Sequence, residues 1–185
     1  MHDPDTDLKQ ALRDYAQRWP EETALAAQFA ALLDDAQDPF ARERLQGHFT
    51  GSAWLVSADG ARVLLTHHRK LQRWLQLGGH ADGERDPGAV ALREAQEESG
   101  LSGLTLLSTR IFDLDRHWIP ERKDAPGHWH YDLRYVVRAG ADETFMVSAE
   151  SLDLAWCEVA DVAAGPDLSM RRMACKWQQA VAAAV

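Results

Sequence analysis

The sequence predicts an α/β fold in which helices cover a mixed β-sheet over residues 49–185, preceded by a helical extension over residues 1–48. Three observations predict this fold. A hairpin pattern begins the larger part, a glycine-rich turn and a capped helix lie in its middle, and strand-like segments follow toward the C-terminus. Strands that precede and follow a helix along the sequence are typical of α/β proteins. A chain of 185 residues is long enough to bury one hydrophobic core.

Helical periodicity predicts the extension. Residues 7–35 read as helical, with a break at Pro20 and a second helix that begins near Glu21. A short helical stretch is expected after a turn at Asp38, through residue 45. The apolar residues at helical spacing are Leu8, Leu12, Tyr15 and Trp19, then Leu25, Phe29, Leu32 and Leu33. The segment holds no cluster of titratable residues, so we interpret it as an element for packing or oligomerisation, compatible with a homodimer, and less often a substrate lid.

The sheet is predicted from short strand-like segments. Residues 53–56 and 63–66 flank Asp59-Gly60, a dipeptide typical of a tight hairpin. Residues 74–77 form another short strand that leads into a glycine pair. The later segments are residues 104–114, 128–137 and 154–159, which we expect to be strands, and residues 170–185, which we expect to be a helix.

The central helix has clear start and stop signals. Asp86 is a good N-cap, and Pro87 suits the first helical position because proline lacks a backbone N–H. Gly100 is a good C-terminal stop. On this helix Glu94 and Glu98 are four residues apart, and Glu97 lies beside them, within an arc of roughly 100°.

Such a stripe of carboxylates repels itself, by about 0.2–0.5 kcal/mol for each pair. A bound Mg²⁺ or Mn²⁺ ion, which prefers hard oxygen ligands, would reverse that repulsion. A solvated acidic helix face is the simpler interpretation of the three glutamates taken alone. The residues around them favour the metal site.

The segment from Gly79 to Leu101 resembles the signature box of the Nudix hydrolases, G-x5-E-x7-R-E-U-x-E-E-x-G-U, where U is aliphatic. The matching residues are Gly79, Arg93, Glu94, Glu97, Glu98, Gly100 and Leu101. One position departs from the pattern, because Arg85 stands where the first glutamate belongs. Glu84, one residue earlier, takes this supporting role if the loop is shifted by one residue. Asp82 is a second candidate, and the role is otherwise vacant.

The resemblance implies an α/β/α sandwich and a metal-dependent hydrolase that cleaves a diphosphate linkage in a nucleoside diphosphate linked to another moiety. Mg²⁺, or Mn²⁺, is the implied cofactor. The implied metal ligands are Glu94, Glu97, Glu98 and the carbonyl of Gly78. Arg93 is expected to position a glutamate, and Gly79 to support the site. Glu150, in the loop before the last strand, resembles a further acidic residue of the family, and either Glu94 or Glu150 is expected to be the general base.

Four further residues are candidates for binding the substrate: Arg69, His80, His130 and Arg134. Polar and apolar residues alternate along residues 128–135, which places His128, His130, Asp132 and Arg134 on one face of a strand. That face could line a pocket or simply meet solvent. Arg69 could contact a diphosphate or belong to a basic exposed turn, and His80 could have a structural role.

The composition of the chain argues against several classes of protein. A formal net charge of −9 argues against broad attraction to nucleic acid or anionic membranes. No apolar run is long enough for a membrane span, and the first residues do not resemble a signal peptide. Two cysteines, Cys157 and Cys175, are best explained as reduced thiols in the cytoplasm.

Two alternatives remain open. An isopentenyl-diphosphate-isomerase-like enzyme would need a cysteine in the active site, and neither Cys157 nor Cys175 is suitably placed in the sequence. A non-catalytic sensor or binding module of the same fold would have no need to keep three mutually repelling carboxylates.

Overall fold

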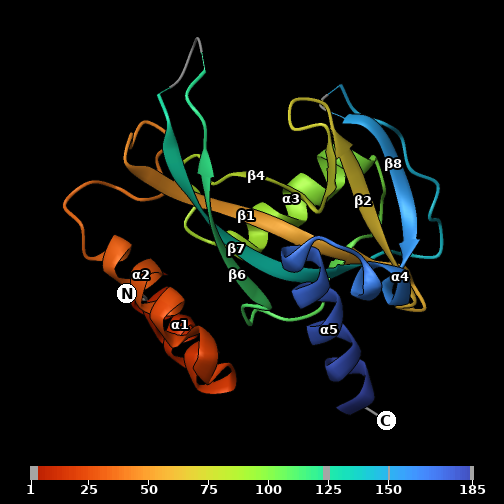
Figure 1. Cartoon of the computed structure of the whole chain (residues 1–185), viewed down its shortest axis with the longest axis horizontal. Coiled ribbons are helices and arrows are strands. Elements are labelled where there is room, and N and C mark those ends of the chain that lie inside the picture. Colours follow the sequence, from red (N-terminus) through yellow and green to blue (C-terminus); the bar gives the residue numbers. More distant parts are fainter. Residues whose placement is uncertain (1–3, 123–125, 150, 184–185) are drawn as a thin grey trace.

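The computed structural model describes residues 4–122, 126–149 and 151–183. In this part of the chain an eight-stranded mixed sheet lies between helices, as predicted (Figure 1). The strands are β1 (Gly47–Val56), β2 (Arg62–His68), β3 (Arg73–Leu75), β4 (Leu77–His80), β5 (Thr105–Leu106), β6 (Asp113–Ile119), β7 (His128–Arg138) and β8 (Ser151–Glu158). The helices are α1 (Pro4–Arg18), the 3₁₀ turn η1 (Pro20–Glu22), α2 (Thr23–Leu33), α3 (Pro87–Ser99), α4 (Val159–Ala164) and α5 (Leu168–Ala183).

Strand β1 is the centre of the sheet, and the strand order is β3-β2-β1-β7-β5. β4 also pairs with β1, β6 with β7, and β8 with β2. The pair of β1 and β7 is parallel, whereas the other pairs are antiparallel. The predicted hairpin is present, with Val56 opposite Val63 and Gly60 at φ 77° in the turn.

Two apolar clusters lie on opposite faces of the sheet because successive strand residues point to opposite sides. On one face Ala53 and Leu55 of β1 belong to a core shared with α1, α2 and α3. On the other face Trp54 and Val56 belong to a smaller core shared with α4 and α5. We use the names α3 face and α5 face for these two sides.

Helix α3 has the predicted ends. The Asp86 carboxylate accepts hydrogen bonds from the backbone N–H groups of Gly88 (2.9 Å) and Ala89 (3.2 Å), and Gly100 ends the helix at φ 67°. Gly51 of β1 lets the helix approach closely, since a Cβ atom there would lie 2.8 Å from the Pro87 carbonyl oxygen and from Val90. These features fix the position of α3 over β1.

Several predicted elements are wrong. Residues 39–45 form turns rather than a helix, because their backbone groups bond elsewhere: the Pro39 carbonyl accepts from Phe49 N–H and the Phe40 carbonyl from Gly83 N–H. The strand expected over residues 104–114 is interrupted, and only β5 and the first residues of β6 fall within it. A turn after β5, where the Ser108 hydroxyl accepts from Arg110 N–H, separates the two strands.

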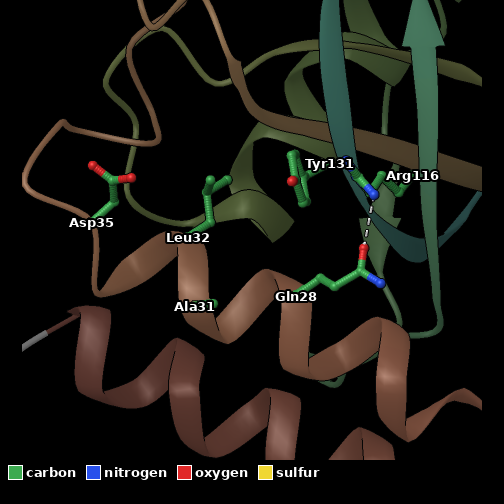
Figure 2. A pocket seen from close by; sticks show the side chains of 6 residues that line it. All are labelled: Gln28, Ala31, Leu32, Asp35, Arg116 and Tyr131. Atoms are coloured by element: carbon green, nitrogen blue, oxygen red, sulfur yellow. Dashed lines mark hydrogen bonds between the residues drawn. The ribbon is translucent and has the colours of Figure 1, made fainter.

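The N-terminal helices share the core of the larger part. Phe29 of α2 stacks on Phe49 of β1, with ring centroids 6.0 Å apart. Between α2 and the strands β6 and β7 lies a hollow of about 340 Å³, across which Arg116 donates a hydrogen bond to Gln28 (3.1 Å; Figure 2). None of the predicted glutamate ligands lines this hollow. The domain boundary between residues 48 and 49 stays a prediction, and β1 itself begins at residue 47.

Among the described residues, none of the helices combines the length and the apolar composition that a membrane span requires.

Candidate active site

The carboxylates of α3 lie against the glycine pair of β4. The Gly78 N–H donates a hydrogen bond to the Glu98 carboxylate (2.8 Å). A Cβ atom on Gly79 would lie 2.4 Å from an oxygen of Glu94, so only glycine leaves room for that carboxylate. The structure therefore brings Gly78, Gly79, Glu94 and Glu98 together, as the sequence predicts.

Arg93 contacts the neighbouring glutamate and the end of β4. Its guanidinium donates hydrogen bonds to Glu94 (2.9 Å) and to the His80 carbonyl oxygen (3.0 Å). Its Nε atom lies 4.0 Å from the Glu97 carboxylate, at the edge of an ion pair. Arg93 is therefore in contact with Glu94, and its role in positioning a glutamate stays a prediction.

Glu97 differs from the other two glutamates in its exposure. Its side chain is 64% exposed, whereas that of Glu94 is 17% exposed and Glu98 is buried. Glu94 and Glu98 reach the glycine pair, and Glu97 projects from the same helix toward solvent. Carboxylate oxygens beside a strand end are the ligands that Mg²⁺ and Mn²⁺ prefer, so this donor set fits a hard divalent cation.

Arg85, which stands where the signature box has a glutamate, lies in the loop before α3. Its guanidinium pairs with Asp5 of α1 (2.8 Å) and with Asp38 (3.3 Å), and it lies over the Phe40 ring. Arg85 is therefore directed toward the N-terminal helices. Glu84 is exposed, and its carboxylate accepts a hydrogen bond from Asp86 N–H (3.0 Å).

The second candidate for the shifted position already has a cationic partner. Asp82 lies in the same loop and forms an ion pair with Arg42. That pair holds the pKa of the Asp82 carboxyl below its usual value, chiefly through the hydrogen bond from Arg42.

Two of the predicted substrate-binding arginines donate to protein groups. Arg69 donates to the backbone carbonyls of Ala149 (3.1 Å) and Ser151 (2.9 Å) and so ties a loop to β8. Arg134 is buried on the α5 face. Its guanidinium donates to Asp132 (2.7 Å), Asp113 (2.9 Å) and the Ser169 hydroxyl (2.7 Å) and lies 3.3 Å from Asp115. A role of either arginine in substrate binding stays a prediction.

The polar face predicted on residues 128–134 is present. In the sheet register His130, Asp132 and Arg134 of β7 lie beside His48, Thr50 and Ser52 of β1. The Thr50 and Ser52 hydroxyls both donate to Asp132, at 2.9 and 2.7 Å. This row lies on the α5 face, as does His80, which is opposite Thr50.

Sequence reasoning missed a histidine cluster. His48, His80, His128 and His130 each place one ring nitrogen within 4.8 Å of the other three. We predicted His80 and His130 as substrate contacts, but His48 was not singled out. The signal that would have found it is the parallel pairing of β1 with β7, which places His48 opposite His130. The alternation of polar and apolar residues along a single strand does not predict which residue of another strand lies opposite.

Glu150, the predicted additional acidic residue, lies outside the described residues. Its roles as a general base and as a metal-site neighbour stay predictions. The preceding residues 143–149 are irregular and lead to β8.

Comparison with known proteins identifies the family of the chain. The family model described as NUDIX domain matches residues 48–176. A NUDIX-family hydrolase from Clostridium perfringens is 25% identical, with a TM-score of 0.56, over 71% of this chain and 97% of that one. An Ap4A hydrolase from C. elegans has a TM-score of 0.56 at 18% identity, over 73% of this chain and 98% of that one. The NUDIX domain of Shewanella oneidensis NrtR, solved with ADP ribose, has a TM-score of 0.50 at 16% identity, over 82% and 97% of the two chains.

No curated protein matches the chain. The family model covers well over half of the sequence and spans both the glutamate helix and the sheet that carries it. The solved structures share the sandwich architecture. The chain therefore belongs to the NUDIX domain family.

Proposed function

We propose that the protein is a divalent-cation-dependent hydrolase that cleaves the diphosphate linkage of a nucleoside diphosphate joined to another moiety. The observation that carries the proposal is the set of α3 glutamates at the glycine pair of β4, with Glu98 bonded to Gly78 and Glu94 over Gly79. The proposal that the substrate contains a nucleotide is supported by the likeness to an Ap4A hydrolase and to a domain solved with ADP ribose.

Glu94, Glu97, Glu98 and the Gly78 carbonyl would hold Mg²⁺ or Mn²⁺. When bound, the cation would supply charge neutralisation at the non-bridging and leaving oxygens of the diphosphate and would help to orient the attacking water. A chain with a net charge of −9 needs such a local positive centre to admit an anionic substrate.

The chain's own residues then perform two tasks. Arg93 and the Gly78 N–H hold Glu94 and Glu98, so that the two carboxylates face β4 before the substrate arrives. A carboxylate of the site accepts the proton of the attacking water, and Glu94 and Glu150 are the candidates for this general base.

The alternatives gain no support from the site. Cys157 lies on β8, in contact with the apolar cluster of the α5 face, and burial raises the pKa of its thiol. Cys175 is exposed on α5. Neither belongs to the α3 face that carries the glutamates, as an isomerase-like reaction would require. Free thiols agree with the proposed cytoplasmic location, and a homodimer stays a prediction.

A substrate panel tests the proposed function. We expect Mg²⁺-dependent release of nucleoside monophosphates or phosphate from compounds such as ADP-ribose, nucleoside diphosphate sugars or dinucleoside polyphosphates, and no release in EDTA. Isopentenyl diphosphate serves as the control for isomerase chemistry. Tight nucleotide binding without turnover in Mg²⁺ or Mn²⁺ would support the sensor alternative instead.

Separate substitutions of Glu84 and Arg85, the two residues at the altered position of the signature box, test which of them supports the site. We expect Glu84→Gln to lower kcat markedly, because a carboxylate near the cation is favourable. We expect Arg85→Ala to leave kcat nearly unchanged and to lower the melting temperature, because Arg85 ties α1 to the loop through Asp5. Steady-state kinetics and thermal melting of both variants check this. A large loss of kcat in Arg85→Ala alone would contradict the assignment to Glu84.

A further inference from the structure

Four histidines from three strands meet on the α5 face of the sheet. His48 is the second residue of β1, His80 is the last residue of β4, and His128 and His130 are the first and third residues of β7. The ring of His48 lies at the centre of the group, with centroid distances of 5.1, 4.9 and 5.1 Å to the rings of His80, His128 and His130. We call these four side chains the histidine cluster.

The central ring carries a buried nitrogen without a partner. His48 is 2% exposed, and its Nε2 atom has no hydrogen-bond partner among the described residues. Its Nδ1 atom lies 3.3 Å from the Arg44 carbonyl oxygen, which can only accept, so Nδ1 carries the proton. Nε2 therefore presents a lone pair. A buried lone pair that meets no donor costs free energy unless something else binds it.

A second ring, that of His128, has the same tautomer. The Nδ1 atom of His128 donates to the Pro126 carbonyl oxygen (2.8 Å), which leaves Nε2 as the lone-pair atom. This Nε2 accepts a hydrogen bond from Nε2–H of His130 (3.1 Å), a proton that a shared metal ion would replace. Two ligands at about 2.1 Å from a tetrahedral zinc ion are separated by about 3.4 Å, so this pair already has nearly the required spacing. Backbone carbonyls that fix the ring tautomer are the usual partners of metal-binding histidines.

Burial favours the neutral form, which ligation needs, in three of the four rings. Burial, followed by the neighbouring histidines, lowers the pKa of His80 to about 4 and that of His130 to about 2. Burial likewise lowers the pKa of His48. Neutral imidazoles can share a cation, whereas four protonated rings at this distance would repel each other.

We propose that the histidine cluster binds one transition-metal ion of the Zn²⁺ type in a tetrahedral all-nitrogen site, separate from the glutamate site. Imidazole ligands suit Zn²⁺, Co²⁺, Ni²⁺ and Cu²⁺, whereas Mg²⁺ prefers oxygen. The two sites lie on opposite faces of β4, since Gly79 faces Glu94 on α3 and the next residue, His80, points to the other side.

The bound ion would stabilise the position of β4, the strand that contains Gly78 and Gly79. It would join β4 to β1 and β7, and β4 pairs only with β1 in the described sheet. An ion that binds the folded chain alone stabilises it by mass action, so the melting temperature rises with metal concentration. Metal binding by the histidine cluster requires neither the proposed substrate nor hydrolysis.

Cobalt binding tests the site directly. The full chain, stripped with EDTA and dialysed, is titrated with Co²⁺ in excess Mg²⁺, which occupies oxygen sites. We expect one equivalent of Co²⁺ to give the intense visible absorption of a tetrahedral complex, Zn²⁺ to displace it, and Zn²⁺ to raise the melting temperature.

Four variants distinguish the histidine cluster from other sites. His128→Asn and His48→Asn should each weaken Co²⁺ binding by about 100-fold or more. His67→Asn is the matched control, because His67 stacks on Trp74 outside the cluster, and it should bind as the wild type does. Glu97→Gln should also keep the cobalt spectrum. His128 is half-buried, so its variant remains informative even if His48→Asn fails to fold.

Two results would overturn the proposal. One is a wild-type chain that gives no tetrahedral cobalt spectrum. The other is cobalt binding that survives in folded His128→Asn but disappears in Glu97→Gln, which would assign the ion to the glutamates. Loss of hydrolysis by itself affects only the proposed function, because cobalt binding is measured without substrate.

Discussion

Glu97→Gln should reduce kcat by about 100-fold or more while leaving the fold intact. A glutamine keeps the size of the side chain and removes the charge that a divalent cation requires. Loss of groups that merely orient metal ligands costs about 10–100-fold, so loss of a ligand should cost at least as much. The Glu97 side chain is 64% exposed, and its ion pair with Arg93 is 4.0 Å long. Its removal should therefore change the melting temperature by only about 1 °C.

Substitution of Glu97 tests the metal site more directly than substitution of Glu94 or Glu98. Glu98 accepts a hydrogen bond from Gly78 N–H, and Glu94 is bonded to Arg93, so substitution of either also disturbs the strand or the helix. Mg²⁺ binding by calorimetry, kcat and thermal melting of Glu97→Gln give three separate readings. Glu158→Gln, an exposed glutamate at the end of β8, is the control. Unchanged Mg²⁺ binding and unchanged kcat in Glu97→Gln would remove Glu97 from the site.

Local signals explain how much of the active site the sequence could predict. The cap at Asp86, the stop at Gly100 and the glutamate spacing all act within one helix, and the structure has each of them. The family resemblance added the glycine pair, which lies next to that helix in space as well as in sequence. Such features need no knowledge of strand pairing.

Features that depend on strand pairing were missed. The position of β6 follows from its pairing with β7, where Asp113 is opposite Arg134 and His117 opposite His130. Its alternating polar residues become interpretable only after that pairing is known. His48 belongs to a cluster only because β1 runs parallel to β7, a pairing between segments more than 70 residues apart in the sequence. For the same reason the sequence did not reveal the ion pairs of Arg134 with Asp113 and Asp115, because both carboxylates come from another strand, β6.

That ion-pair network gives the largest expected effect on stability. Asp113 is fully buried on β6. Its carboxylate accepts hydrogen bonds from Arg134 (2.9 Å), from Arg172 (2.9 Å) and from Lys176 (2.7 Å). Lys176 is itself buried and lies 2.6 Å from Glu22 of η1. One carboxylate therefore joins the sheet to α5 and, through Lys176, to the N-terminal helices.

We expect Asp113→Asn to lower the free energy of unfolding by about 3–5 kcal/mol, because it leaves buried cations without a compensating charge. For a chain of this size that corresponds to a fall in melting temperature of about 10 °C. Denaturant unfolding and thermal melting of the variant check this. Asp161→Asn, which removes an exposed carboxylate of α4, is the control and should change stability by less than about 0.5 kcal/mol.

The same carboxylate should make stability depend on pH in the acid range. Burial alone raises the pKa of Asp113, but the charges of Arg172, Arg134 and Lys176 outweigh burial and hold the pKa below its ordinary value. A depressed pKa means that the unfolded chain takes up the proton more readily than the folded chain. The stabilisation from Asp113 is thus complete above about pH 4–5 and is lost as the pH falls through the folded-state pKa. Wild type should therefore lose more stability than Asp113→Asn between pH 5 and the acid transition, and parallel stability curves for the two proteins would contradict the assigned role of Asp113.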